Sequence, residues 1–421
     1  MMLRPLTAVC VLALLAACGE PPTSAPDPDP VDAVELFGVT GDGLASVDRV
    51  IVDLLRQWQI PGATLAVARD GRLVVARGYG RNVGDADALV APDARGRVAS
   101  LSKPITSAAV LKLVESGVLR LDDAVFGEWL AAPDDPDPRL GDITIDHLLT
   151  HRGGWNPFVS LDPMFNPRLI AQARGVPSPP DFDDILAFMA ERDLEFSPGT
   201  DVQYSNFGYS VLARVIEAAS HETYEDFVRR EVVGPAGITG MEIGGTLEDE
   251  RLPGEMRYRG LASEAVLMPS VFDDRPGPVP YPYGGFYLRP MDGHGGWVSS
   301  AIDLVRFGLA MDGDAGIPDL LAPEVRGLVD AAPVPLGGGS YGYGWFVSGA
   351  EWHHSGRLPG SASRLVIEGD GTVYAMLLNA SHPNEGAFLG DVVRTLEAAM
   401  DGVSAWPDHD LFDQYPPTPG S

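Results

Sequence analysis

Short runs rich in apolar and β-branched residues stand near both ends of this chain. Asp70-Gly71 separates the first two of these runs, which is typical of a tight hairpin turn. The runs that predict strands are 63–68 and 73–78 near the N-terminus, and 341–348, 362–368 and 372–379 near the C-terminus. Helical spacing of apolar residues predicts one helix over 45–59 and another over about 385–400.

Helices and long loops are expected between these two sets of strands. The segment from Ser100 to Gly117 is apolar nearly all round, which predicts a buried helix, and a second helix is expected from Gly296 to about Met311. Residues 121–292 carry further helical patterns and irregular stretches rich in Pro and Gly. We therefore predict an α/β (α+β) fold. Its N- and C-terminal segments build one antiparallel sheet flanked by helices, and the mostly helical region 121–292 is inserted.

The first residues read as a targeting segment. Arg4 precedes a short apolar run that ends in Leu-Ala-Ala-Cys-Gly, which resembles a bacterial lipoprotein signal. Residues 1–17 are expected to be a signal peptide and Cys18 to carry lipid; an ordinary signal peptide cut at the small residues is the alternative. Residues 18–40 are predicted to be a disordered tether, because they are rich in Pro, Asp and Ser. The folded domain is then 41–402, and 403–421 form a tail.

These features predict an exported, cell-envelope lipoprotein that meets the lipid bilayer through its anchor. The residue after the lipidated cysteine is Gly19, whereas an Asp at this position would retain a lipoprotein in the inner membrane. We therefore expect the protein in the outer membrane, facing the periplasm. Lys and Arg number 30 against 59 Asp and Glu, a formal net charge of −29, which repels nucleic acid. The two cysteines, Cys10 and Cys18, both lie in the leader region, so the folded domain has neither a disulfide nor a thiolate metal site. No cofactor is expected.

Ser100 and Lys103 are the first candidate for chemistry. They stand three residues apart at the start of the buried segment, so their side chains can point into one cavity. A serine hydroxyl needs a base to become a nucleophile, and a desolvated lysine can have its pKa lowered enough to supply one. The alternative from this motif alone is an N-cap serine beside a solvated lysine.

Two later motifs favour the catalytic interpretation of Ser100 and Lys103. Tyr204-Ser205-Asn206 and His354-Ser355-Gly356 follow S-x-x-K in the order and at the kind of spacing seen in the serine β-lactamase and penicillin-recognising superfamily. The chain resembles this superfamily over roughly residues 41–400, and is most similar to its class C β-lactamase-like branch of esterases, D-aminopeptidases and D,D-carboxypeptidases. The resemblance implies a β-lactamase/transpeptidase-like fold.

The resemblance also implies roles for these residues. Ser100 is expected to attack a carbonyl, Lys103 to be its base, and the Tyr204 phenol to transfer a proton to and from the leaving group. Asn206 is expected to hold Lys103 and the substrate. Taken singly, Tyr204 could be a core tyrosine and Asn206 a helix N-cap.

The third motif is expected to form the opposite wall of the site. By resemblance, His354 and Ser355 bind substrate, and the backbone N–H groups of Ser100 and of Arg357, just after Gly356, form the oxyanion hole. A solvent-facing strand histidine is the alternative for His354. Trp155 and Trp297, which stand where smaller aliphatic residues are usual, are expected to narrow the pocket.

A histidine in the third motif differs from the Lys-Thr-Gly of efficient class C β-lactamases. We therefore predict a serine hydrolase that forms an acyl-enzyme with carboxylic esters or D-amino-acid amides and peptides. A D,D-carboxypeptidase or a weak β-lactamase is the alternative enzyme, and a catalytically silent protein that binds peptidoglycan peptides is the alternative of another class.

Two other patterns are assigned no catalytic role. Gly338-Gly339-Ser340-Tyr341-Gly342 matches the G-x-S-x-G elbow of α/β-hydrolases, but the strand-like run follows Ser340 instead of preceding it. His147 and His151 are expected to be helix-end residues.

Overall fold

A nine-stranded antiparallel sheet forms the frame of the computed structural model, which describes residues 34–38, 43–84, 88–132, 136–314 and 317–416. Strands from the two ends of the chain lie side by side, because β2 pairs with β15 from Ala63↔Leu378 to Arg69↔Thr372. In spatial order the strands are β1 (Leu36–Gly38), β3 (Arg72–Gly80), β2 (Gly62–Arg69), β15 (Thr372–Leu378), β14 (Ser361–Ile367), β13 (Glu351–Leu358), β12 (Phe346–Ser348), β11 (Gly339–Tyr341) and β10 (Val334–Leu336). The fold predicted from the sequence is confirmed.

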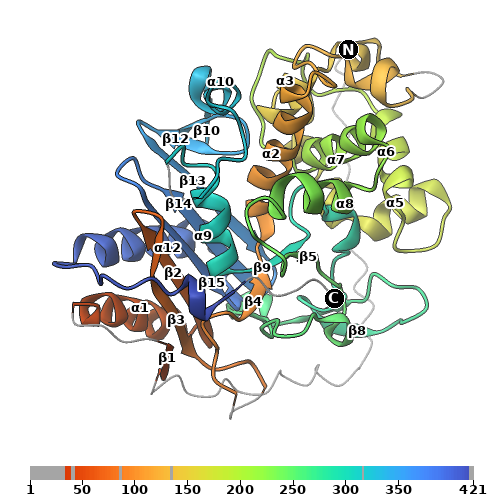
Figure 1. Ribbon diagram of the computed structural model, residues 1–421. Coiled ribbons are helices and arrows are strands. Elements are labelled where there is room, and N and C mark those ends of the chain that lie inside the picture. The colour runs from red at the N-terminus through yellow and green to blue at the C-terminus, as the bar shows by residue number, and fades with distance from the viewer. Residues whose placement is uncertain (1–33, 39–42, 85–87, 133–135, 315–316, 417–421) are drawn as a thin grey trace, which may run out of the picture. The chain divides into compact units, whose positions relative to one another are not determined.

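Alternation along the strands gives the sheet two apolar faces. Leu65 and Met376 pack with α1 (Ala45–Trp58) and α12 (Glu385–Asp401) on one face, whereas Ala66 and Ala375 belong to the core on the other. Figure 1 shows α1 and α12 next to one another, with α9 (Ala301–Leu309) lying across the sheet. Helices therefore cover both faces of the sheet, because the strands present apolar side chains on each face.

The inserted region packs its helices around α2 (Ser102–Glu115). Nearly every residue of α2 is buried, which follows from its lack of a polar face. The α-helices of the inserted region are α3 (Ile145–Leu149), α4 (Pro157–Ser160), α5 (Pro167–Arg174), α6 (Phe182–Ala190), α7 (Asn206–Ser220) and α8 (Tyr224–Val228); α10 (Pro323–Arg326) and α11 (Leu328–Ala331) follow it in the chain. Figure 1 shows α5, α6, α7 and α8 grouped to one side of the large sheet.

A three-stranded sheet lies beneath the start of α2. It pairs β4 (Arg95–Arg97) and β5 (Glu242–Ile243) with the two sides of β9 (Trp297–Ser300). Two smaller pairs join β16 (Ala380–Ser381) to β6 (Arg259–Gly260) and β7 (Leu267–Pro269) to β8 (Pro278–Pro280). Since β4 runs directly into residue 98, this sheet sets the position of Ser100.

Three local predictions were wrong. Trp297–Ser300 is a strand and not the first turn of a helix, because both of its edges find partners; α9 starts only after the N-cap Ser300. The run 341–348 is not one strand: Tyr341 ends β11, Phe346–Ser348 is β12, and a turn lies between them, in which Gly344 adopts a φ of +83°. Leu36–Gly38, placed in the disordered tether, pairs with β3 as an edge strand.

The C-terminal tail packs against the sheet over its described part. Leu411 is buried, and its N–H donates to the carbonyl of Leu73 on β3. No helix in the described ranges is long and apolar enough to cross a bilayer. The predicted signal peptide and Cys18 lie outside those ranges, and they stay predictions.

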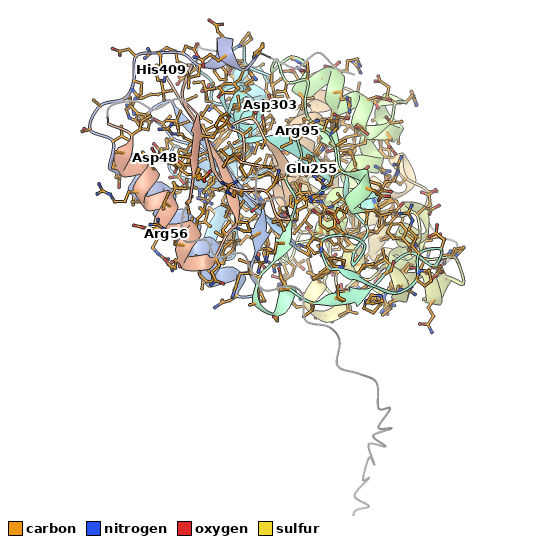
Figure 2. The ribbon with its side chains drawn as sticks, turned by 90° about the horizontal axis from the view of Figure 1, so that it is seen from below. Asp48, Arg56, Arg95, Glu255, Asp303 and His409 are labelled. Carbon is orange, nitrogen blue, oxygen red and sulfur yellow. The ribbon has the colours of Figure 1, made fainter. Side chains whose placement is uncertain are left out.

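A buried ion pair attaches α1 to the sheet. The guanidinium of Arg77 is 1% exposed and lies 3.0 Å from a carboxylate oxygen of Asp48, whose other oxygen accepts from the Tyr79 hydroxyl at 2.9 Å. On the same helix, Arg56 and Asp53 form a looser pair at 4.0 Å with side chains that are 51% and 68% exposed. Figure 2 shows Asp48 and Arg56 on this helix.

We expect Asp48→Ala to lower the free energy of unfolding by about 3–5 kcal/mol, because it leaves the Arg77 charge buried without its partner. Asp53→Ala, the matched control on the solvent side of α1, should change it by less than about 1 kcal/mol. Urea unfolding followed by circular dichroism measures both. Equal effects of the two variants would contradict the anchoring role of Asp48.

Candidate active site

Ser100 lies in a short 3₁₀ turn, Ala99–Leu101, between β4 and α2. Ala99 has a φ of +51°, in the left-handed region that residues with a Cβ rarely adopt, so the chain turns sharply just before the serine. The turn is held from both sides. The Val98 N–H donates to the Trp297 carbonyl at 2.9 Å, and the Ser363 hydroxyl donates to the Val98 carbonyl at 2.7 Å.

Lys103 lies in the first turn of α2 with its side chain fully buried. Its Nζ is 3.1 Å from Ser100 Oγ, 2.8 Å from Asn206 Oδ1 and 3.2 Å from the His294 carbonyl oxygen. Burial lowers the pKa of Lys103 well below its usual value, and the carboxylate of Asp162 only partly opposes this shift. With two acceptors fixing its orientation, a neutral amine can direct its lone pair at the Ser100 hydroxyl.

Tyr204 lies above this amine. Lys103 Nζ is 4.5 Å from the centroid of the Tyr204 ring. Burial raises the pKa of Tyr204 far above its usual value, although a hydrogen bond with Ser100 pulls it back in part. The phenol therefore stays protonated in the resting site, and it can act as a proton donor.

Asn206 connects Lys103 to a carboxylate that the sequence reasoning missed. Asn206 Oδ1 accepts a hydrogen bond from Lys103 Nζ, and Asn206 Nδ2 donates to Asp162 Oδ2 at 2.6 Å. Asn206 is the first residue of α7, and Ser205 is the N-cap that accepts from the Gly208 N–H, so the N-cap alternative for Asn206 does not hold. Burial raises the pKa of Asp162.

Aromatic rings close the site behind Tyr204. The His151 ring lies 4.4 Å from the Tyr204 ring and 4.8 Å from the Tyr341 ring, centroid to centroid, and the His354 ring lies 5.9 Å from Tyr341. Burial lowers the pKa values of His151 and His354 well below the usual value, so both rings are neutral. His151 is therefore part of the site and more than a helix-end residue.

The neutral rings have opposite hydrogen-bonding characters. His354 Nδ1 lies 2.6 Å from the Ser355 carbonyl and must donate to it, which leaves Nε2 of His354 as an acceptor. His151 Nδ1 accepts from the Ser205 N–H at 3.1 Å, which leaves its Nε2 as a donor. Within the described part of the chain both Nε2 atoms are buried without a partner.

The edge of β13 forms the opposite wall. A Cβ on Gly356 would lie 2.2 Å from the Val98 carbonyl oxygen and 3.0 Å from the Ser100 nitrogen, so only glycine lets this strand approach the serine. Arg357 follows Gly356, which puts its backbone beside the Ser100 N–H. Alternation along β13 turns Ser355 away from the side that holds His354, and its hydroxyl accepts from Arg364 at 3.0 Å.

The two tryptophans lie in different places. Trp155 is buried, and with Asp162 and Asn206 it lines a cavity of about 10 Å³, which holds no more than one water, so its place in a substrate pocket stays a prediction. Trp297 is fully buried, and its indole N–H donates to the Tyr224 hydroxyl at 3.0 Å, so it belongs to the core beneath the site. Placing Trp297 in the pocket wall was wrong, because β9 turns its side chain inward.

Three residues of the site escaped the sequence analysis in whole or in part: Asp162, His151 and His294. None lies in one of the three catalytic motifs, and each reaches Lys103 or Tyr204 only through folding. Ser340, the elbow candidate, lies exposed on the hairpin strand β11, with no helix directly after it. In the described ranges, no three His, Cys, Asp or Glu residues are arranged to hold a metal ion.

Known proteins share this sequence pattern and fold. The sequence profile of the Beta-lactamase family matches residues 47–399. Penicillin-binding protein 4 of Amycolatopsis lactamdurans is 29% identical over 382 residues, which are 83% of this chain and 89% of that protein.

Two solved structures share the fold at low identity. D-amino acid amidase from Ochrobactrum anthropi SV3, complexed with L-phenylalanine amide, has a TM-score of 0.65 at 21% identity, covering 86% of this chain and 100% of its own. EstCE1, described as a hydrolase with promiscuous acyltransferase activity, has a TM-score of 0.65 at 20% identity, covering 87% and 100%.

The charge of Asp162 generates a prediction about pH. Asp162→Asn removes a negative charge that favours protonated Lys103, so the pKa of Lys103 falls further and the neutral amine persists to lower pH. We expect the acid limb of the pH profile of kcat/KM for an ester to move to lower pH. Asp201→Asn, which removes a carboxylate from an exposed position close in sequence, should leave that limb in place. A shift to higher pH in Asp162→Asn would contradict this coupling.

Proposed function

The chain belongs to the Beta-lactamase family, and on this premise we propose that it is a serine hydrolase acting on carboxylic esters or D-amino-acid amides through an acyl-enzyme on Ser100. The observation that carries the proposal is the 3.1 Å approach of the buried Lys103 Nζ to Ser100 Oγ. A hydroxyl next to a desolvated amine is the arrangement that a lysine-activated nucleophile requires.

In the proposed mechanism the neutral Lys103 amine takes the Ser100 proton as Oγ bonds to the substrate carbonyl carbon. The carbonyl oxygen becomes an oxyanion and accepts from the backbone N–H groups of Ser100 and Arg357. The close passage of Gly356 beside the Ser100 nitrogen supports this pair of donors. Tyr204 donates its phenolic proton to the leaving group, and the Lys103 ammonium returns a proton to Tyr204. Water then hydrolyses the ester on Ser100 by the reverse transfers.

The wall opposite Ser100 favours substrates without a carboxylate. His354 is neutral and presents an acceptor, so it offers an anion neither a charge nor a donor. The Arg357 side chain forms an ion pair with Glu264, and Arg364 donates to Ser355 on the face of β13 that points away from His354, so neither positive charge is directed beside His354. The D-amino acid amidase that shares the fold supports D-amino-acid amides as substrates, and the hydrolase with acyltransferase activity supports transfer of an acyl group.

Penicillin-binding protein 4 favours an alternative. Its similarity over most of both chains supports a D,D-carboxypeptidase or weak β-lactamase activity. A silent protein that binds peptidoglycan peptides is less favoured, because such a role needs no buried amine directed at a serine. Export and a lipid anchor at Cys18 complete the proposal, and they place the site in the cell envelope.

The acyl-enzyme is tested by variants of the reacting pair. Ser100→Ala and Lys103→Ala should each lower ester kcat by about 10⁴-fold or more, and the double variant should lose about the same, because the two residues act as a unit. A fluorophosphonate probe should label the wild type stoichiometrically and Ser100→Ala not at all. Ser340→Ala, the matched control in the G-x-S-x-G sequence, should keep activity within a few-fold. Additive losses in the double variant would contradict a shared step.

The substrate class is tested by comparing nitrophenyl butyrate with nitrocefin. We expect kcat/KM to favour the ester in the wild type, because the carboxylate of nitrocefin meets no cation at His354. His354→Lys introduces a permanent positive charge and should shift the ratio modestly toward nitrocefin. A wild-type preference for nitrocefin would make the protein a β-lactamase with an unusual third motif.

A further inference from the structure

Three large apolar side chains next to the site face solvent. Phe158, Val159 and Leu161 are 88%, 70% and 52% exposed, and the first two are the most exposed large hydrophobic residues in the described ranges. They belong to the segment Pro157–Leu161, here called the apolar loop, which contains α4 and no charged residue. Exposed apolar residues that gather in this way mark binding surfaces more often than singly scattered ones do.

The apolar loop is joined to the nucleophile by a short chain of contacts. Its next residue, Asp162, accepts from Asn206 at 2.6 Å. Asn206 lies 2.8 Å from Lys103, which lies 3.1 Å from Ser100. A group held at Ser100 therefore lies within a few side-chain lengths of the loop.

A small, mostly apolar cavity of about 10 Å³, room for one water, lies under the loop. Pro157 and Leu161 line it from the loop, and Trp155, Met189 and Phe207 line it from the body of the protein, with Asp162 and Asn206 among its polar members. Apolar packing thus extends from the loop to Asn206, beside the Lys103 amine. Because the cavity is too small for an alkyl chain, such a chain would lie on the exposed face of the loop. Such a surface has nothing to offer a charged or strongly polar substituent.

The backbone holds the loop outward at a cost. Leu161 has φ +71° and ψ 158°, a conformation that essentially only glycine adopts. Three hydrogen bonds to Asp162 hold this turn in place: its carboxylate accepts from the Met164 N–H and from Asn206, and its carbonyl accepts from Asn166. The strained residue thus directs Asp162 into the site and the apolar side chains out of it. Strain of this kind gathers at ligand-binding segments.

We propose that the apolar loop binds the acyl chain of the substrate, and that the preferred esters carry acyl chains longer than four carbons. This inference rests on the proposed function and specifies its substrate class. An alkyl chain is the occupant that the surface favours, because binding it removes Phe158, Val159 and Leu161 from water without leaving a polar group unsatisfied. The neighbouring carboxylate of Asp162 disfavours an anionic chain end.

The test is a chain-length series with one leaving group. The wild type should show kcat/KM rising from nitrophenyl acetate through butyrate to octanoate. The double variant Phe158→Ser, Val159→Ser should lose about tenfold on octanoate, from the apolar area it no longer buries, and stay within about twofold on acetate. Both positions are exposed and α4 buries none of its residues, so the variant should fold.

Leu36→Ser, Phe37→Ser is the matched control. These side chains are 43% and 50% exposed on the edge strand β1, which packs against none of the site elements, and the octanoate preference should persist. A flat chain-length profile in the wild type, or equal losses on acetate and octanoate in the loop variant, would overturn the inference. Loss of binding to phosphatidylglycerol vesicles with unchanged ester selectivity would also overturn it, because the loop would then serve a membrane surface.

Labelling separates this inference from the proposed function. Fluorophosphonates with ethyl and octyl chains need only a reactive Ser100, and the octyl probe should label the wild type faster but the loop variant at the ethyl rate. Labelling without a chain-length preference would refute the acyl-chain site alone. No labelling by either probe would refute the serine hydrolase itself.

Discussion

The burial of the Lys103 amine is the constraint on which the rest of the site depends. An ammonium group in this position would require compensation, and Asp162, the carboxylate that acts on it among the described residues, is itself buried enough to have a raised pKa. The surrounding groups are accordingly neutral acceptors, the amide oxygen of Asn206 and the carbonyl of His294. A neutral lysine is thus cheaper to bury than a charged one, and neutrality is the state that can take a proton from Ser100.

The architecture explains how this amine stays dry and close to its partner. Helix α2 passes through the centre of the molecule, the small sheet positions its first turn, and β13 passes so close to Ser100 that Gly356 admits no side chain. Each wall comes from a different part of the chain. The site is therefore a product of the assembled fold, and no single segment would form it in isolation.

Electrostatics in the site contrast with the rest of the protein. The chain carries a formal net charge of −29, yet the imidazoles of His151, His294 and His354 around Lys103 are all held neutral by burial. Recognition in such a pocket depends on hydrogen-bond direction and on apolar contact more than on charge. That property favours esters, amides and alkyl chains over carboxylate-bearing substrates. The neutral His354 and the apolar loop share it, because neither offers a positive charge to a substrate.

The sequence by itself determined the frame and the reacting groups. Apolar runs joined by short turns that contain Asp-Gly predicted the β2–β3 and β14–β15 pairs, and the spacing of Ser100 and Lys103 brought hydroxyl and amine together, because both effects are local. Tertiary structure decided what distant segments contribute. Asp162 and His151 approach Tyr204, Asn206 and Lys103 only through packing, the strand at Trp297 exists because neighbours pair with both of its edges, and the register of β13 decides that His354 faces the site while Ser355 faces away.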